Sequence, residues 1–397
     1  MKLCFILNSI HSHGGIQRMQ ATLSNELCKA HDITIIEARL RPRKQYAEKC
    51  PYPLSPEVKL INCTPFKSRI SYIIRRRILG NILRLTGLAN IKVFYRLWFW
   101  LTFPSKLQKE LTTQINNENY DMVIAVAVYN TVLLSYISEK INAKTVSWLR
   151  NPYERYFGGR TSCFWGLEKI FKESLKNINE CIVLTHDMKK NYDKHLNIST
   201  CVIPNARSFV SEEKSKVQAK MFVACGRFVA QKGFDLLISA FNEFAKTDAE
   251  WELTIVGDGP SRLEVESLIK KFDLCERITI TGFVDNVNDY LLNSSIFLMT
   301  SRYEGFGNVI AEAFEIGLPI IAWDVDSIDL IENGSDGILV APFDTSAYAA
   351  QMLKLSSDDT ERKRMAQNAA TKAEQFSVEK VAEKWEILFD GILHKEI

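Results

Sequence analysis

Two glutamates stand on either side of a glycine turn in the segment RYEGFGNVIAE, residues 302–312. Glu304 precedes the apolar period of a helix, and Glu312 lies inside that helix. Carboxylates accept hydrogen bonds from vicinal hydroxyls, so a sugar is a natural ligand for them. Gly305 and Gly307 allow close approach to the backbone, and the free N–H groups where the helix starts favour an anion. The alternative is a helix start alone, with Glu304 stabilising the dipole and Glu312 solvated.

A second motif, CGRFVAQKG, places Arg227 and Lys232 on a strand-to-helix connection. The planar fork of an arginine and the mobile ammonium of a lysine can both converge on one diphosphate. The alternative is a surface loop whose cations face solvent. Because the motif occurs together with the glutamate segment, we interpret the two as parts of a site for a diphosphate-linked sugar.

A glycine pair, Gly14 and Gly15, follows the first apolar run and precedes the first helical pattern. It indicates a second cradle for an anion or a hydroxyl, whereas the fingerprints GxGxxG and GxxxxGK[ST] do not occur. His11 and His13 have no carboxylate or cysteine at metal-binding spacing, so we interpret them as polar loop residues. We interpret the DVD sequence at residues 324–326 as a coincidence and expect no metal.

Short apolar runs alternate with helical patterns along nearly the whole chain, which predicts parallel α/β sheets. A chain of 397 residues is too long for one ordinary core. We therefore expect two Rossmann-like domains, residues 1–205 and 206–376, and a C-terminal helix over 377–397 that crosses back to the first domain. The polar stretch 211–220 is the expected linker. Such sheets bind ligands at the carboxyl ends of their strands, where these motifs lie.

The basic segment 66–109 contains ten Lys or Arg, no acidic residue, and interleaved Ile, Leu, Phe and Trp. Basic residues interrupt each apolar run before ~18 residues accumulate, which argues against a transmembrane helix. The composition is typical of a surface that contacts anionic lipids; the alternative is helices packed on the core with solvated arginines outside. No nucleic-acid-binding motif accompanies the charge. Nine scattered cysteines without CxxC indicate reduced thiols in the cytoplasm.

Several motifs recur in a fixed order: Gly14-Gly15, CGRFVAQKG, VGDGP at 256–260, GFVDNV at 282–287, the segment 304–312 and GLPIIA. In this order and spacing the chain resembles the glycosyltransferases of family 4 over nearly its full length. The resemblance implies the GT-B fold, in which two Rossmann-like domains face a central cleft. It also implies transfer with retention from a nucleotide-sugar, without a metal or other cofactor.

By that resemblance, Arg227 and Lys232 hold the diphosphate, Glu304 contacts the donor sugar and Glu312 the ribose, and Arg227, Lys232 and Glu304 are the catalytic residues. Preorganised donors that meet the charge growing on the leaving diphosphate lower the barrier without a metal. The expected donor-binding residues are Gly14, Gly15, Gly226, Arg227, Lys232, Glu304, Gly305, Phe306, Gly307, Asn308, Val309 and Glu312.

One departure concerns the loop WLRNPYERY, where family members often carry a histidine. Arg150 or Asn151 occupies that place and is the expected contact to the donor sugar or to the acceptor. The opening HGGIQRMQATLSNEL is similar to members that build bacterial surface polysaccharides.

We therefore expect transfer of a hexose (Gal, Glc or an N-acetylhexosamine) from a UDP-sugar to a lipid-linked oligosaccharide or lipopolysaccharide acceptor. The products would be O-antigen, capsule or lipopolysaccharide. The enzyme would lie in the cytoplasm, peripherally on the inner face of the cytoplasmic membrane and its anionic lipids. Two other functions stay open: a nucleotide-sugar epimerase or hydrolase of the same fold, and a non-catalytic protein that docks on membranes and binds glycans.

Overall fold

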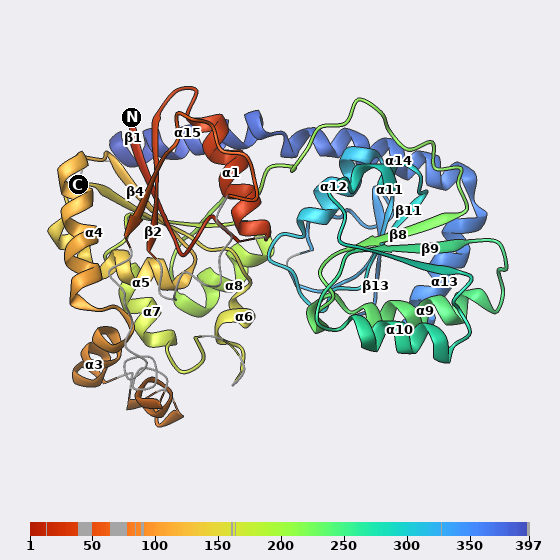
Figure 1. The fold of residues 1–397 in the computed structure, drawn as a ribbon, viewed down its shortest axis with the longest axis horizontal. Coiled ribbons are helices and arrows are strands. Elements are labelled where there is room, and N and C mark those ends of the chain that lie inside the picture. Colours follow the sequence, from red (N-terminus) through yellow and green to blue (C-terminus); the bar gives the residue numbers. More distant parts are fainter. Residues whose placement is uncertain are drawn as a thin grey trace. The chain divides into compact units, whose positions relative to one another are not determined.

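The structure of the protein is a computed structural model that describes residues 1–12, 14–38, 50–63, 78–83, 85–88, 91–159, 162, 164–326 and 328–394. The chain divides into two compact units (Figure 1). Unit 1 comprises Met1–Pro204 and Val378–Ile397, and unit 2 comprises Asn205–Ser377.

Unit 1 is built on a parallel sheet whose seven described strands follow the order β3-β2-β1-β4-β5-β6-β7. The second to sixth residues of β1 (Lys2–Leu7) are all buried, because this strand lies in the middle of the sheet and helices cover both faces. The other strands are β2 (Asp32–Ala38), β3 (Lys59–Cys63), β4 (Met122–Val126), β5 (Lys144–Trp148), β6 (Glu180–Val183) and β7 (Cys201–Val202).

The C-terminal helix α15 (Val378–His394) belongs to the core of unit 1. The ring of Trp385 is fully buried, with its centroid 6.2 Å from that of Phe5 and 5.0 Å from that of Trp148. Helices α1 and α15 lie on one face of the sheet, and α5 and α7 on the other (Figure 1). The remaining bounds are α1 (Gly15–Leu27), α3 (Lys92–Thr102), α4 (Ser105–Glu118), α5 (Val128–Ile137), α6 (Tyr153–Phe157), α7 (Glu168–Leu175) and α8 (His186–Leu196).

Unit 2 repeats the plan with six parallel strands in the order β10-β9-β8-β11-β12-β13. Its core gathers aromatic rings, among them Phe222, Phe241 and Trp251. Helices α9, α10 and α13 cover one face, and α11, α12 and α14 the other (Figure 1). The strands are β8 (Met221–Cys225), β9 (Glu252–Val256), β10 (Ile278–Gly282), β11 (Ile296–Met299), β12 (Ile320–Trp323) and β13 (Gly337–Val340). The helices are α9 (Phe234–Ala245), α10 (Arg262–Lys271), α11 (Asn288–Leu292), α12 (Asn308–Ile316), α13 (Thr345–Ser357) and α14 (Asp359–Ala373).

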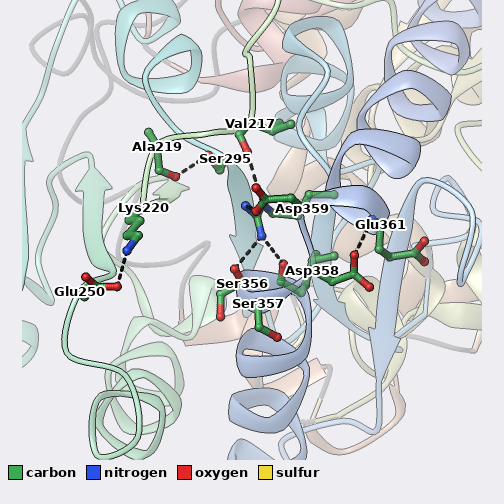
Figure 2. A network of polar contacts seen from close by, with 12 residues as sticks. Val217, Ala219, Lys220, Glu250, Ser295, Ser356, Ser357, Asp358, Asp359 and Glu361 are labelled. Carbon is green, nitrogen blue, oxygen red and sulfur yellow. Dashed lines mark hydrogen bonds and ion pairs between the residues drawn. The ribbon is translucent and has the colours of Figure 1, made fainter.

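A buried arginine fixes the segment that leads into β8. Arg362 donates hydrogen bonds to the carbonyl oxygens of Val217 (3.3 Å) and Ser356 (2.6 Å) and pairs with Asp359. Figure 2 shows Val217, Ser356 and Asp359 gathered in this network, where α13 meets α14. A buried guanidinium is stabilised when its N–H groups find acceptors. The polar stretch 211–220, which we expected to be a linker, is therefore part of unit 2.

The two parallel Rossmann-like sheets confirm the predicted fold class. Strand β3 was not predicted, because its sequence KLINC has only one fully buried residue and lacks the apolar run of the others. Part of the basic segment, namely residues 66–77, 84 and 89–90, lies outside the described residues. None of the described helices combines the length and hydropathy that a membrane span requires.

Candidate active site

The loops after β8 and β9 lie directly against each other at the carboxyl edge of the unit 2 sheet. The Gly226 N–H donates to the Val256 carbonyl over 3.0 Å. A Cβ on Gly257 would lie 2.0 Å from the Gly226 oxygen, and one on Gly259 would lie 2.5 Å from the Phe228 oxygen. Only glycine allows such close approach. The VGDGP motif therefore fixes the backbone that carries the CGRF motif.

Lys232 and Glu304 form an ion pair beside this loop. Lys232 ends the 3₁₀ turn Ala230–Lys232, and its stem packs on Gly226, where an added Cβ would lie 3.2 Å from Cε. Its Nζ is 2.6 Å from Glu304 Oε1, and the two side chains are only 17% and 8% exposed. Ser301 donates to the same oxygen over 2.6 Å. Arg227 is exposed, and no ion pair or hydrogen bond engages its side chain within the described part of unit 2.

Helix α12 begins where the glycine turn predicted it. Gly307 precedes the helix in the left-handed conformation, with φ 72° and ψ 60°, which favours glycine. No side chain caps this end, so the first N–H groups, at Asn308 and Val309, lack helical partners. The start of α12 therefore has the features of an anion site next to Glu304.

Glu312 lies inside α12 and is 94% buried, since only 6% of the residue is exposed. Its Oε1 accepts a hydrogen bond from Ser208 Oγ over 2.5 Å. Burial raises the pKa of the Cys225 thiol at the end of β8; the charge of Glu312 raises that pKa further, and the charge of Lys232 opposes the shift. Glu312 and Lys232 thus lie around the same strand end, and the alternative of a solvated Glu312 is wrong.

Three polar residues at this site were not singled out from the sequence. Ser301 contacts Glu304, Ser208 contacts Glu312, and the Asn205 amide donates to Asn308 Oδ1 over 2.7 Å. Their only signal was a position just after a strand. The segment that carries Asn205 and Ser208 is held on α12 by a buried ion pair, in which Arg207 Nη1 lies 2.5 Å from Glu315 Oε2.

In unit 1, Gly14 and Gly15 stand at the start of α1, as predicted. The Gly14 N–H donates to the Tyr52 hydroxyl over 3.2 Å, and the Gln17 amide donates to the Ser9 carbonyl over 3.0 Å. The part expected of these glycines in donor binding stays a prediction.

His11 lies in the loop after β1, as interpreted from the sequence, and has a carboxylate partner there that was not predicted. Its Nδ1 lies 2.9 Å from Oε1 of Glu37, which is fully buried in β2. The same oxygen accepts from Ser9 Oγ (2.8 Å) and from the Ile10 N–H (2.7 Å). Glu37 therefore holds the loop after β1 in place. Sequence spacing does not reveal this contact, because two parallel strands bring the residues together. His13 lies outside the described residues.

Arg150 and Asn151 follow β5 and behave differently. Asn151 is hydrogen-bonded within unit 1. Its side-chain amide donates to the Tyr156 hydroxyl over 3.0 Å, and its backbone carbonyl accepts from the Tyr192 hydroxyl over 2.9 Å. Arg150 is only 5% exposed, and its guanidinium carbon lies 4.2 Å from the ring centroid of Trp148. Burial lowers the pKa of Arg150 to about 9, so the side chain remains charged at neutral pH.

Across the described residues, no three His, Cys, Asp or Glu side chains are grouped in a way that could hold a metal ion. Arg227, Lys232 and the N-terminus of α12 are positive groups at the carboxyl edge of the unit 2 sheet.

Residues 205–372 match the family of group 1 glycosyl transferases. The chain is 28% identical to an uncharacterized glycosyltransferase of Methanocaldococcus jannaschii over 350 residues, covering 74% of this chain and 86% of that protein. It is 24% identical over 394 residues to a Campylobacter jejuni enzyme, covering 97% of each chain. That enzyme is named as the alpha-1,4-N-acetyl-D-galactosaminyltransferase that acts on GalNAc-alpha-(1->4)-GalNAc-alpha-(1->3)-diNAcBac-PP-undecaprenol.

Among solved structures, HepE of Anabaena in complex with UDP shares the fold, with a TM-score of 0.75 and 17% identity over 98% of this chain and 100% of that one. The sheets, the site and these similarities define a class: the protein is a glycosyltransferase of the GT-B fold. The match to the group 1 glycosyl transferases, residues 205–372, covers nearly the whole of unit 2.

Proposed function

We propose that the protein transfers a hexose from a nucleotide-sugar, most simply a UDP-sugar, to a lipid-linked glycan with retention at the anomeric carbon. The observation that carries the proposal is the grouping of Lys232, Glu304 and Glu312 around the end of β8 and the start of α12. This grouping matches the three parts of a donor: diphosphate, sugar and ribose.

In this proposal Lys232 and Arg227 bind the diphosphate, and the free N–H groups of α12 contribute to the same charge. These donors stabilise the negative charge that grows on the departing nucleoside diphosphate; losing one such donor typically costs ~2.7–4 kcal/mol. Glu304 accepts hydrogen bonds from the sugar hydroxyls and Glu312 from the ribose. The acceptor oxygen bonds to the anomeric carbon on the face from which the diphosphate leaves, and its proton passes to the leaving phosphate, so no enzymic nucleophile is required.

A lipid-linked acceptor is supported by the substrate in the name of the Campylobacter relative and by the surface of unit 1. Half of the large apolar side chains found exposed in the described residues fall between residues 78 and 100: Ile78, Leu79, Ile82, Leu85, Ile91, Leu97 and Trp100.

Helix α3 has features of both alternatives given for the basic segment, namely packing on the core and exposure of apolar groups at the surface. Trp98 and Phe99 are buried in unit 1, as packing on the core requires, whereas Leu97 and Trp100 are 39% and 55% exposed. Exposed apolar groups together with the basic residues of this segment suit an anionic bilayer surface. We therefore place the enzyme, as a proposal, on the inner face of the cytoplasmic membrane, where it would serve O-antigen, capsule or lipopolysaccharide synthesis.

Two assays test the proposal. Stabilisation against heating is measured across UDP-, GDP-, ADP- and dTDP-sugars, and transfer from the best stabiliser to lipid-linked glycans is then followed. A donor that stabilises the protein without any turnover would favour the non-catalytic alternative. For the membrane, Leu85→Asp should weaken binding to vesicles with anionic lipid, whereas Leu263→Asp, at an even more exposed position in unit 2, should not. Equal binding of both variants would exclude this docking surface.

A further inference from the structure

Three arginines are buried in the described residues, and Arg150 is the exception among them. Arg207 pairs with Glu315, and Arg362 donates to backbone carbonyls and pairs with Asp359. No described residue accepts a hydrogen bond from Arg150, and its Nε and Nη1 are both fully enclosed without a partner.

The surroundings of Arg150 are aromatic rather than acidic. Its guanidinium lies on the face of Trp148, and Tyr156 is the one group whose charge raises its pKa against the effect of burial. A cation–π contact compensates part of the lost hydration, but it leaves the N–H groups at the edge of the guanidinium unused. A buried charge without a partner is unfavourable, and such groups are typical of ligand sites rather than of stable cores.

We infer that Arg150 binds an anionic group of a substrate, either a carboxylate or a phosphoryl group, through its unpartnered guanidinium N–H groups. Both groups present two oxygens to the fork of an arginine. Two substrates of the proposed transfer can supply the group: a uronic acid on the donor sugar, or the diphosphate of a lipid-linked acceptor. The inference thus rests on the proposed function. It adds that one of the two substrates carries an anionic group at the point where it contacts Arg150.

Matched pairs of probes separate the two sources. The donor arm compares the dissociation constants of UDP-glucuronic acid and UDP-glucose, which differ in one carboxylate. The acceptor arm compares farnesyl diphosphate with farnesol in a Lys232→Ala background, which removes the proposed diphosphate site of unit 2. Each arm is measured by calorimetry on three full-length proteins: one that retains Arg150, one with Arg150→Met and one with Arg150→Lys.

We expect the charged probe of one arm to bind at least tenfold tighter than its neutral partner. Arg150→Met should abolish that preference, and Arg150→Lys should retain part of it. The unliganded Arg150→Met protein should melt at the same or a higher temperature, because an unpaired buried charge has been removed. The inference fails if neither arm shows a preference, if Arg150→Met preserves the preference, or if Arg150→Met melts lower without ligand. The acceptor arm and the melting temperature do not depend on donor binding in unit 2, so they remain decisive if the proposed function is wrong.

Discussion

Lys232 and Glu304, which are 72 residues apart in the chain, meet with 2.6 Å between Nζ and Oε1. The proposed mechanism assigns Lys232 to the diphosphate and Glu304 to the sugar, but in this ion pair the two side chains bind each other. When a donor binds, both residues would therefore exchange partners. Lys232 would pair with the phosphate oxygens of the donor, and Glu304 would accept hydrogen bonds from its sugar hydroxyls. The first two predictions follow from this exchange.

Lys232→Ala removes a donor that meets the leaving group, so we expect turnover to fall by about 10²–10³. The fold should be retained, because the side chain lies at the edge of the sheet and is partly exposed. Initial rates of transfer and circular dichroism check both points. Lys246→Ala, an exposed lysine at the end of α9, serves as the matched control and should turn over normally. Near-normal turnover of Lys232→Ala would exclude the assigned phosphate contact.

Glu304→Gln should separate nucleotide binding from transfer. The neutral amide no longer competes for Lys232, so UDP should bind as tightly as before or up to about fivefold tighter, equivalent to ~1 kcal/mol. Transfer should nevertheless fall, because the amide is a weaker acceptor for sugar hydroxyls than the carboxylate. Calorimetry with UDP and rate measurements give the two values. Clearly weaker UDP binding in this variant would mean that Glu304 supports the nucleotide instead of the sugar.

Glu312→Gln tests the ribose contact. A hydrogen bond to a charged group contributes ~1.5–3 kcal/mol, so wild-type protein should prefer UDP over 2′-deoxy-UDP or 3′-deoxy-UDP by about tenfold or more. The variant should lose that preference, while Glu266→Gln on the surface of α10 should keep it. If wild type and variant discriminate equally, Glu312 does not contact the ribose.

Gly257→Ala should be far more harmful than Gly334→Ala, although both glycines have positive φ, of 144° and 79°. A Cβ at Gly334 meets nothing within 4 Å, so only backbone strain of ~1–2 kcal/mol is expected. At Gly257 the Cβ would collide with the Gly226 oxygen, and we expect ~3 kcal/mol or more together with lost activity. Urea denaturation compares the two variants; similar midpoints would show that the two loops are not held in close contact.

The ion pair of Asp235 with Arg302 predicts a pH dependence. Partial burial disfavours the Asp235 carboxylate, but the hydrogen bonds to Arg302, the charge of Arg302 and the backbone N–H groups of Asp235 and Leu236 together outweigh this effect and lower the pKa of Asp235 from its ordinary value. A carboxyl with a lowered pKa in the folded state contributes stability above its unfolded pKa, and the contribution is lost as the pH falls through the folded pKa. Asp235→Asn should therefore reduce stability at pH 7 and flatten its decline below about pH 4. Asp285→Asn, at an exposed position, is the control. If Asp235→Asn shows the same dependence of stability on pH as this control, the ion pair makes no such contribution.

Features that depend on neighbours in the chain were predictable from the sequence. The buried strand β1 shows as an unbroken apolar run, and the start of α12 shows as a glycine followed by a helical period. Strand β3 escaped prediction because it lies at the edge of the sheet, where only Cys63 of its five residues is buried and no apolar run is needed.

Contacts between distant residues were not predictable in the same way. Glu37 reaches His11 only because β2 pairs with β1, and Ser208 reaches Glu312 across 104 residues. The burial of Arg150 was equally hidden, since an arginine in a loop is usually solvated. The motifs located the site, and the packing of the strands decided which side chains contact one another within it.

The most direct test of the account is an experimental structure of the protein with UDP bound. We predict that phosphate oxygens lie within hydrogen-bond distance of Lys232 Nζ and of the first N–H groups of α12, that the Lys232–Glu304 pair is opened, and that ribose hydroxyls contact Glu312. A nucleotide bound away from the end of β8, with Lys232 and Glu304 still paired, would contradict the account.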